Sequence, residues 1–378
     1  MLFGQIEEMM KSKILFIMHM PPPVHGAAMM GKYLHDSELI NEKFECHYIN
    51  PSLSSSVANV GKVSIGKIVF MIKNIVNIIS KVKHIKPDLC YYTPTADGWG
   101  IYRDLIVLSL LKWQKQKIVL HMHNKGVRNF SNKHRFARWT YRRIFKNTHV
   151  ILLAKELYPD IQEYVLKENI YYCPNGMPQT NLVGYERSSV HTPYTFLFLS
   201  NMIEAKGVVD LLKACAMLSK NGIKFTCNFV GRWSTVSEER FDKLVKVFGI
   251  EDKINYLGAK YDKEKIREFI HSDALVFPSH SETFGLVLLE AMEYEMPCIS
   301  TCVGGIPSVV NDGDTGFLVQ AKDTKALADK MLWLIEHQEE GLLMGKKGRN
   351  RFLENFTLDI FEHRMVDILS SELNITIN

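Results

Sequence analysis

The chain has 378 residues, of which 46% are hydrophobic and 23% charged, and a net charge of +5. This length exceeds what one ordinary core organises, so we expect two domains, and the composition excludes a disordered or fibrous chain. No apolar run is long enough to span a bilayer, and the start of the chain lacks the apolar core of an export signal. Seven cysteines without a CxxC pair argue against a zinc site and favour a reducing, cytoplasmic compartment.

The charge is distributed unevenly along the chain. Residues 1–190 carry 25 Lys and Arg against 14 Asp and Glu, a balance of +11, whereas the remainder carries 21 against 27, a balance of −6. This asymmetry supports two domains with different partners. A basic surface suits anionic lipid, a phosphate-bearing acceptor or nucleic acid, and the charge alone does not choose among them.

Short buried runs alternate with helical patterns in the first half, which predicts a parallel sheet. The expected strands are 13–18, 44–49, 87–92, 117–124, 148–153 and 169–173, and the expected helices include 66–84 and 155–167. Ligands bind at the carboxyl ends of such strands. We therefore single out His25 and Gly26 after the first strand and Arg103 near a helix start after the third.

Two histidines mark the end of the fourth strand. His121 and His123 point the same way at a spacing of two residues, at the edge of the sheet where ligands bind. A single histidine is more often a satisfied core residue, and the pair makes a site as probable as a structural role.

Residues 125–146 form the strongest cluster of basic and aromatic side chains. Lys and Arg alternate there with Phe136, Trp139, Tyr141 and Phe145. No nucleic-acid recognition motif accompanies them, so we prefer contact with a membrane surface or with the diphosphate of a lipid-linked acceptor. A merely solvated helix remains an equal alternative.

The second half repeats the alternation after an irregular segment over residues 177–193. Strands are expected at 194–199, 225–230, 253–257, 274–278 and 297–300, and a turn plus a strand at 311–319. A final helix over 358–373 is expected to cross back onto the first domain. We place the domains at 1–187 and 188–357, with residues 358–378 returning to the first.

The stretch 279–292 carries the chemistry of this half. Glu282 falls in a strand-to-helix loop and Glu290 about two turns into the helix that follows. Gly285 allows a close approach to the backbone, and the free N–H groups of the helix start can hold an anion. Two carboxylates for sugar hydroxyls around an anion seat indicate a nucleotide-sugar site. The alternative for each glutamate alone is a helix cap or a solvated side chain.

The Glu-x7-Glu spacing around Phe284 and Gly285 resembles the donor motif of retaining glycosyltransferases of family 4, the group 1 type of bacterial glycosyltransferase, which have the GT-B fold. The Gly-Gly-x-Pro loop ending at Pro307 also resembles that family. Lys206 matches the family's diphosphate-binding Lys, but Asn201 stands where the family has Arg, and Arg232 is a candidate substitute.

The resemblance implies an α/β fold of two Rossmann-like, doubly wound parallel-sheet domains facing across a cleft. His123, Glu282 and Lys206 would be catalytic, and His25, Gly26, His121 and Arg103 would lie on the acceptor or sugar side. The donor would be held by Asn201, Lys206, Arg232, Glu282, Thr283, Phe284, Gly285, Leu286 and Glu290. No cofactor and no obligatory metal are expected.

The implied activity is retaining transfer of a sugar from a nucleoside diphosphate sugar to a saccharide or lipid-linked saccharide in cell-surface polysaccharide synthesis. The expected location is the cytoplasm, at the inner face of the plasma membrane, with peripheral contact through the basic half and no nucleic acid. A nucleotide-sugar epimerase of the same fold and a non-catalytic nucleotide-sugar-binding protein are the alternatives. The sequence does not identify the base, the sugar, the acceptor, the linkage or the oligomeric state.

Overall fold

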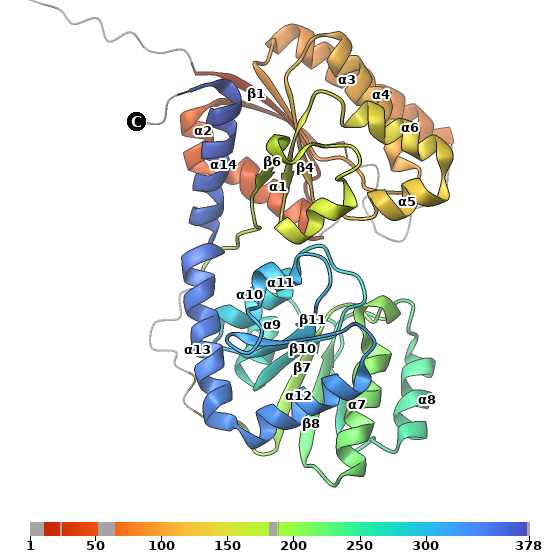
Figure 1. Cartoon of the computed structure of the whole chain (residues 1–378), viewed down its shortest axis with the longest axis vertical. Helices are drawn as coiled ribbons and strands as arrows, with labels where there is room; N and C mark the ends of the chain where they lie inside the picture. The colour runs from red at the N-terminus through yellow and green to blue at the C-terminus, as the bar shows by residue number, and fades with distance from the viewer. Residues whose placement is uncertain (1–10, 23–24, 52–64, 181–186, 188, 376–378) are drawn as a thin grey trace, which may run out of the picture. The chain divides into compact units, whose positions relative to one another are not determined.

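The computed structural model describes residues 11–22, 25–51, 65–180, 187 and 189–375, with residues 65–70 described by their backbone only. The chain forms two compact units, which are described one at a time (Figure 1). The first contains residues 1–153, 157–174 and 359–378, and the second contains residues 154–156 and 175–358. The boundary expected at 187/188 therefore lies within residues grouped with the second unit, whereas residues 359–378 belong to the first.

The first unit is built on a six-stranded parallel sheet in the order β2-β1-β3-β4-β5-β6. Strands β3 and β4 are buried along their whole length, as expected for apolar runs covered on both faces. The order reverses direction between β1 and β3, so the loops after these strands flank a topological switch point. The strands are β1 (Lys13–Ile17), β2 (Glu45–Ile49), β3 (Leu89–Tyr92), β4 (Ile118–Met122), β5 (His149–Leu152) and β6 (Ile170–Tyr172).

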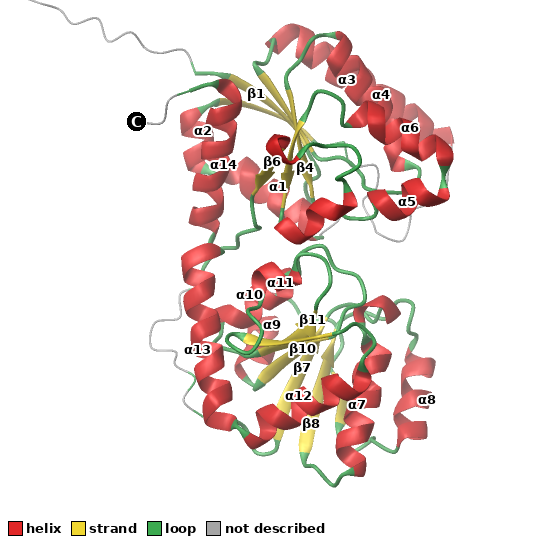
Figure 2. Cartoon of the chain, viewed as in Figure 1, coloured by secondary structure: helices red, strands yellow, loops and turns green. Residues whose placement is uncertain are grey.

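Helices cover both faces of this sheet (Figure 2). They are α1 (Gly26–Asp36), α2 (Glu38–Lys43), α3 (Ile65–Ile85), α4 (Gly100–Trp113), α5 (Val127–Lys133), α6 (Arg135–Ile144) and α14 (Leu358–Leu373). Helix α4 packs between α3 and α6, and α5 packs on α6. The returning helix α14 is fixed by its buried Glu372, whose carboxylate lies 2.8 Å from Nδ1 of His149 and 3.5 Å from Nζ of Lys117.

The second unit repeats the design with a six-stranded parallel sheet in the order β12-β11-β10-β7-β8-β9. Its switch point falls between β7 and β10. The strands are β7 (Tyr194–Leu199), β8 (Phe225–Val230), β9 (Ile254–Tyr256), β10 (Ala274–Phe277), β11 (Cys298–Thr301) and β12 (Gly316–Val319). Around them lie η4 (Glu204–Lys206), α7 (Val208–Lys220), α8 (Glu238–Phe248), α9 (Asp262–Ile270), α10 (Leu286–Glu293), α11 (Ile306–Val309), α12 (Thr324–Glu336) and α13 (Gln338–Asn355).

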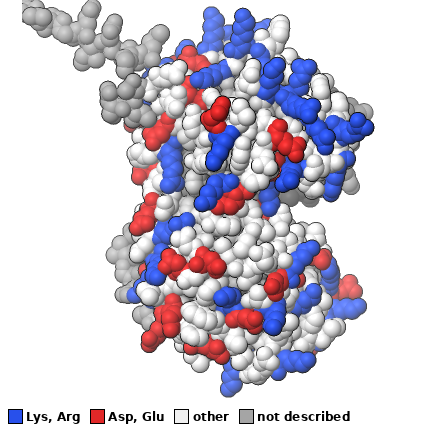
Figure 3. Space-filling view, viewed as in Figure 1, with Lys and Arg blue, Asp and Glu red and all other residues white. Residues whose placement is uncertain are grey.

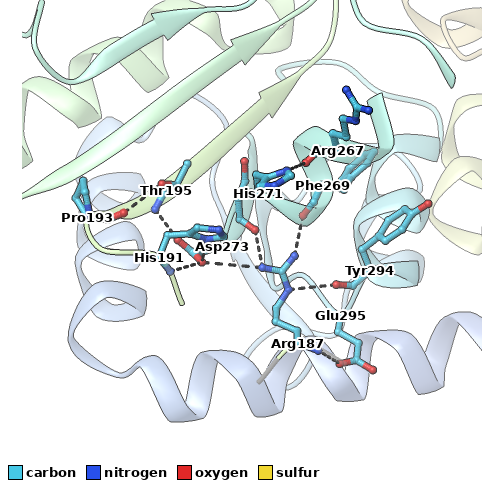
Figure 4. Close-up of polar contacts among 11 residues, drawn as sticks. Arg187, His191, Pro193, Thr195, Arg267, Phe269, His271, Asp273, Tyr294 and Glu295 are labelled. Carbon is cyan, nitrogen blue, oxygen red and sulfur yellow. Dashed lines mark hydrogen bonds and ion pairs between the residues drawn. The ribbon is translucent and has the colours of Figure 1, made fainter. Parts of the chain in front are cut away.

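A buried arginine anchors the segment that precedes β7 (Figure 4). The Arg187 guanidinium donates to the carbonyl oxygens of Ser272 at 2.6 Å, Phe269 at 2.7 Å and Tyr294 at 3.2 Å. The buried carboxylate of Asp273 accepts from the backbone N–H of Thr195 at 2.7 Å, directly where β7 begins. These bonds fix the chain as it enters the second sheet.

The expected Rossmann-like architecture is confirmed for each unit, and one expected helix is wrong. Residues 155–167 do not form an α-helix: a 3₁₀ helix, η2 (Lys155–Asp160), contains Pro159 and is followed by turns. Proline lacks the N–H that an α-helix needs and stops its propagation. The mobile loop expected at residues 52–64 lies outside the described residues.

Candidate functional site

In the second unit, the loops after β7 and β10 meet at the switch point. The backbone N–H of His280 donates to the carbonyl of Ala205 at 2.8 Å, which ties one loop to the other. Gly207 has φ +86°, and a Cβ there would lie 2.1 Å from the carbonyl oxygen of Pro278. Only glycine fits this close approach. The two loops are thus held at a fixed distance at the ligand-binding edge of the sheet.

This contact brings Lys206 and Glu282 together. Nζ of Lys206 lies 2.6 Å from Oε2 of Glu282, with side chains 24% and 16% exposed. The other oxygen of Glu282 accepts from the backbone N–H of Thr283 at 2.9 Å. The site therefore presents a cation and a carboxylate that are already oriented and still reachable from solvent.

Helix α10 begins beside this ion pair. Its N-cap is Gly285, with φ +88°, and no side chain within the described residues caps it. The first N–H groups of a helix have no intrahelical partner, and the helix dipole makes this end attractive to anions. The backbone at Phe284, Gly285 and Leu286 is therefore suited to a phosphate, whereas the Phe284 side chain is buried in the core.

The neighbouring loop is fixed by a second glycine. The N–H of Gly305 donates to the carbonyl of Thr283 at 2.8 Å, and a Cβ on Gly305 would lie 2.6 Å from the same oxygen. The Gly-Gly-x-Pro loop thus supports the loop that carries Glu282. Ser308, on α11 directly after this motif, bonds through Oγ to the carboxylate of Glu156 at 2.5 Å.

Glu290 is in a different setting from Glu282. One of its oxygens lies 2.7 Å from Nζ of Lys265, and its side chain is 21% exposed. The loop after β8 brings Arg232 to the same edge of the sheet, and the loop after β9 supplies Tyr261. The Arg232 guanidinium lies 5.5 Å from the centre of the Tyr261 ring. The backbone N–H of Arg232 donates to Oδ1 of Asn201 at 3.3 Å. Asn201 therefore orders the loop that supplies the arginine.

In the first unit, histidines gather at the carboxyl ends of the strands that flank its switch point. His121 is fully buried, and its Nδ1 lies 2.6 Å from the hydroxyl of Tyr91. The His123 ring centroid lies 4.1 Å from that of His121. Neither ring nitrogen of the buried His123 has a hydrogen-bond partner among the described residues. An unpaired buried imidazole beside a ligand-binding edge is typical of a group that bonds to a ligand.

Burial determines the charge of these histidines. It lowers the pKa of His123 to about 3, with further lowering by nearby His19 and His25. The pKa of His19 is lowered to about 4, mainly by burial and then by the cation of Arg103. Both rings are neutral at physiological pH, so His123 offers one N–H donor and one nitrogen acceptor rather than a positive charge.

Arg103 is engaged by its own neighbour. Its Nε and a terminal nitrogen lie 2.9 and 2.8 Å from Oδ1 of the buried Asp104, which also accepts from the hydroxyl of Tyr92 at 2.8 Å. The Asp104 carboxylate raises the pKa of Arg103 further. A terminal guanidinium nitrogen also bonds to Oγ1 of Thr95 at 3.2 Å. Arg103 thus helps to shape the loop after β3.

His25 and Gly26 lie where α1 begins. His25 is the N-cap, and its Nδ1 accepts from the N–H of Ala28 at 3.2 Å, while Gly26 is the first helical residue. Sequence reasoning missed three residues of the two sites: His19, Lys265 and His280. Nε2 of His280 lies 2.5 Å from the carboxylate of Asp210. No motif or spacing in the sequence marks His19, Lys265 or His280 as a site residue. In the described part of the chain, no group of three or more His, Cys, Asp or Glu is arranged to hold a metal ion.

Comparisons with known proteins agree with this geometry. Residues 186–351 match the family described as Glycosyl transferases group 1. N-acetyl-alpha-D-glucosaminyl L-malate synthase of Bacillus anthracis is 38% identical over 186 residues, 47% of this chain and 46% of that protein. The capsular polysaccharide biosynthesis glycosyltransferase CapM of Staphylococcus aureus is 29% identical over 43% of this chain and 42% of that protein. The alignments thus span less than half the length of these curated relatives.

Solved structures match over nearly the whole chain. Sucrose-phosphate synthase from Thermosynechococcus elongatus has a TM-score of 0.73 and 18% identity, covering 96% of this chain and 99% of that one. Anabaena Alr3699/HepE, solved with UDP and glucose, has a TM-score of 0.70 and 17% identity, covering 95% and 100%. The fold is that of GT-B glycosyltransferases, and residues 186–351 are similar to the group 1 glycosyltransferases.

Proposed function

We propose that the chain is a retaining, family 4 glycosyltransferase that moves a sugar from a nucleoside diphosphate sugar to a saccharide or lipid-linked saccharide in cell-surface polysaccharide synthesis. The observation that carries the proposal is the Lys206–Glu282 pair, 2.6 Å apart, beside the uncapped start of α10. The name of CapM and the UDP-glucose complex of HepE support the same substrate classes. The cleft expected between the units stays a prediction.

The charge on the leaving diphosphate determines the roles at the donor site. As the bond between sugar and phosphate breaks, negative charge grows on the phosphate, and fixed cations and N–H groups stabilise it most where water is excluded. Lys206 and the N–H groups at Phe284, Gly285 and Leu286 supply this stabilisation in our proposal. Glu282 then accepts from sugar hydroxyls, Thr283 holds its carboxylate, and Glu290 accepts from the ribose hydroxyls.

A second cation is needed where the family has arginine. Asn201 carries no charge, but it bonds to the backbone of Arg232, and the exposed Arg232 guanidinium stacks on Tyr261. We assign Arg232 to the nucleotide end of the donor. In this assignment Asn201 acts by holding the loop of Arg232, so loss of Asn201 weakens donor binding without removing a charge.

The histidines serve the sugar in this proposal. Because its pKa is about 3, His123 is neutral and bonds to sugar hydroxyls instead of neutralising phosphate. Its neighbour His121 fixes the ring environment through Tyr91. His25, Gly26 and the loop shaped by Arg103 form the acceptor side. The enzyme needs no divalent metal in our proposal, since Lys206 and the helix start take the phosphate charge, and it acts in the cytoplasm at the inner membrane face.

The decisive experiment measures release of nucleoside diphosphate from a panel of nucleotide sugars, with lipid-linked saccharide acceptors and with chelator present. Lys206→Ala and Glu282→Ala should each lower kcat/KM by about 100-fold or more, because each removes a group aimed at the reacting atoms. Lys213→Ala, an exposed lysine on α7, is the matched control and should leave kcat/KM unchanged. Full activity in both site variants would refute the assignment.

Product analysis separates the alternative enzyme classes. A transferase releases nucleoside diphosphate faster when acceptor is added and keeps the anomeric configuration. An epimerase of the same fold converts the sugar without acceptor, and a binding protein shifts the melting temperature with donor but turns nothing over. Either of the last two results would replace the proposed reaction.

A further inference from the structure

Helices α4 and α6 of the first unit carry an exposed stripe of aromatic side chains. Trp99 is 83% exposed, Phe136 60% and Trp139 45%. The rings follow one another: Trp99 and Tyr102 are 5.6 Å apart, Tyr102 and Phe136 5.5 Å, and Phe136 and Trp139 5.3 Å. Exposing a row of large aromatic side chains to water costs free energy, so a contiguous patch of this kind marks an interaction site.

The helix periodicity explains why these side chains share one face. On α4, Trp99, Tyr102, Ile106 and Trp113 recur at spacings of three, four and seven, so they lie along one line of the helix. On α6, Phe136, Trp139 and Arg143 do the same. Because α4 packs against α6, with Nζ of Lys112 bonded to the carbonyl of Ile144 at 2.7 Å, the two lines form one rigid stripe.

Cations outnumber carboxylates around this stripe, where the exposed Asp97 lies two residues before Trp99. Residues 98–155 contain 13 Lys and Arg and a single acidic residue, Asp104, which is buried. The Arg143 guanidinium lies 5.3 Å from the Trp139 ring. In the described part of the chain the exposed Arg135, Arg138 and Arg142 form no ion pair. Lys and Arg gather over this region, in the upper part of Figure 3.

At the far end of α4 the same combination recurs. Trp113, 76% exposed, lines a hollow of about 410 Å³ together with Lys83 and Lys86. Among the described residues, no helix is long and apolar enough to cross a membrane. The face is therefore built to lie on an interface, with rings that reach the level of lipid headgroups and cations that meet their phosphates.

We propose that the α4–α6 stripe, defined by Trp99, Tyr102, Ile106, Trp113, Phe136 and Trp139 with the bordering arginines, docks the protein on an anionic phospholipid bilayer. Charge complementarity selects the anionic surface, since each cation near such a surface favours binding. The aromatic rings select a bilayer over a nucleic acid, because Trp and Tyr concentrate at the membrane–water interface. The inference names the surface for the membrane contact proposed above, yet it does not depend on glycosyl transfer.

Vesicle co-sedimentation of the full chain tests this surface. Binding is expected to vesicles of phosphatidylcholine with phosphatidylglycerol, to be weak on phosphatidylcholine alone, and to fall with added salt through screening. Arg138→Gln with Arg142→Gln should lower the partition coefficient about thirtyfold, since two cations leave the surface. Phe136→Ala with Trp139→Ala should lower it about tenfold or more and leave the salt dependence in place.

The matched control lies on α8 of the second unit. Lys243→Gln, Lys246→Gln and Val247→Ala remove two exposed lysines and an exposed apolar side chain (Val247, 70% exposed) and should leave vesicle binding unchanged. Thermal melts confirm that each variant folds. Sedimentation of the stripe variants equal to the wild type overturns the proposal, as does binding to single-stranded RNA that anionic vesicles do not displace. Donor turnover is measured separately, so failure of the proposed reaction and failure of this surface are distinguishable.

Discussion

Glu282 and Glu290 have different partners, although their spacing in the sequence suggests one pair. Glu282 shares its two oxygens between Lys206 and the N–H of Thr283. Glu290 contacts Lys265, which comes from another helix. The sequence predicted both carboxylates because they lie in one motif. It did not predict Lys265, because the contact joins residues 25 positions apart through the tertiary fold.

The buried histidines make the stability of the first unit sensitive to acid. The ordinary pKa of histidine is 6.5, and burial lowers it to about 3 in His123 and about 4 in His19. Between pH 6.5 and these lowered pKa values, the histidines are protonated in the unfolded chain but neutral in the folded one, so falling pH favours unfolding. We expect the thermal midpoint to decrease by several degrees as the pH falls from 6.5 toward 4, as measured by circular dichroism.

His123→Gln should flatten this pH dependence, because it removes one of the groups that take up a proton on unfolding. The control is His363→Gln on α14, where the side chain is 61% exposed. That variant should keep the wild-type slope. An unchanged slope in His123→Gln would contradict the assignment of the acid sensitivity to this ring.

At the scale of elements, the loops after β7 and β10 depend on one glycine. Gly207→Ala would place a Cβ 2.1 Å from the carbonyl oxygen of Pro278 at a φ of +86°. We expect a loss of roughly 3 kcal/mol in the free energy of unfolding, from the left-handed backbone and the displaced loop. Donor affinity should fall too, because Lys206 precedes this glycine. Chemical denaturation and titration with a nucleoside diphosphate measure the two effects.

Gly222→Ala is the matched control for the cost of the left-handed backbone alone. Gly222 has φ +74°, but a Cβ there would meet nothing within 4 Å. Its cost should be about 1 kcal/mol, with donor affinity unchanged. Equal losses in the two variants would show that the approach to Pro278 has no effect of its own.

Whether a segment forms a strand or a helix could be predicted from its local sequence pattern where its side chains are uniformly buried. The runs that form β1, β3 and β4 are mostly apolar, as expected for a parallel sheet covered on both faces, with Lys13 at the start of β1 and His121 within β4 as the charged or titratable members. The α-helix expected over residues 155–167 is wrong because this segment contains Pro159, which allows a 3₁₀ helix but ends the α-helical hydrogen-bond ladder.

At the scale of the whole molecule, Arg187 fixes the entry of the chain into the second unit. Its guanidinium lies 4.0 Å from Asp273 and donates to three buried carbonyls. Arg187→Met leaves the three carbonyl acceptors without their donor and removes the guanidinium cation beside the buried Asp273 carboxylate, so the second unit should lose about 3–5 kcal/mol of stability. Denaturant unfolding of the full chain provides the measurement.

Arg240→Met removes an arginine of similar size whose partner, Glu204, is 2.7 Å away on the surface. Water solvates the exposed Glu204 carboxylate once the pair is broken, so the unfolding midpoint should not move. A loss in Arg187→Met no larger than in this control would refute the anchoring role of Arg187.

By itself, the sequence determined the alternation of strands and helices, the two sheets and the motif that holds Glu282 and Glu290. These features depend on neighbours a few residues apart, where periodicity and spacing are decisive. Only the tertiary structure decided which cation faces which carboxylate, that His123 is buried and neutral, and that aromatic rings from α4 and α6 form one stripe. Such contacts join segments distant along the chain, and packing of the folded units rather than local pattern sets them.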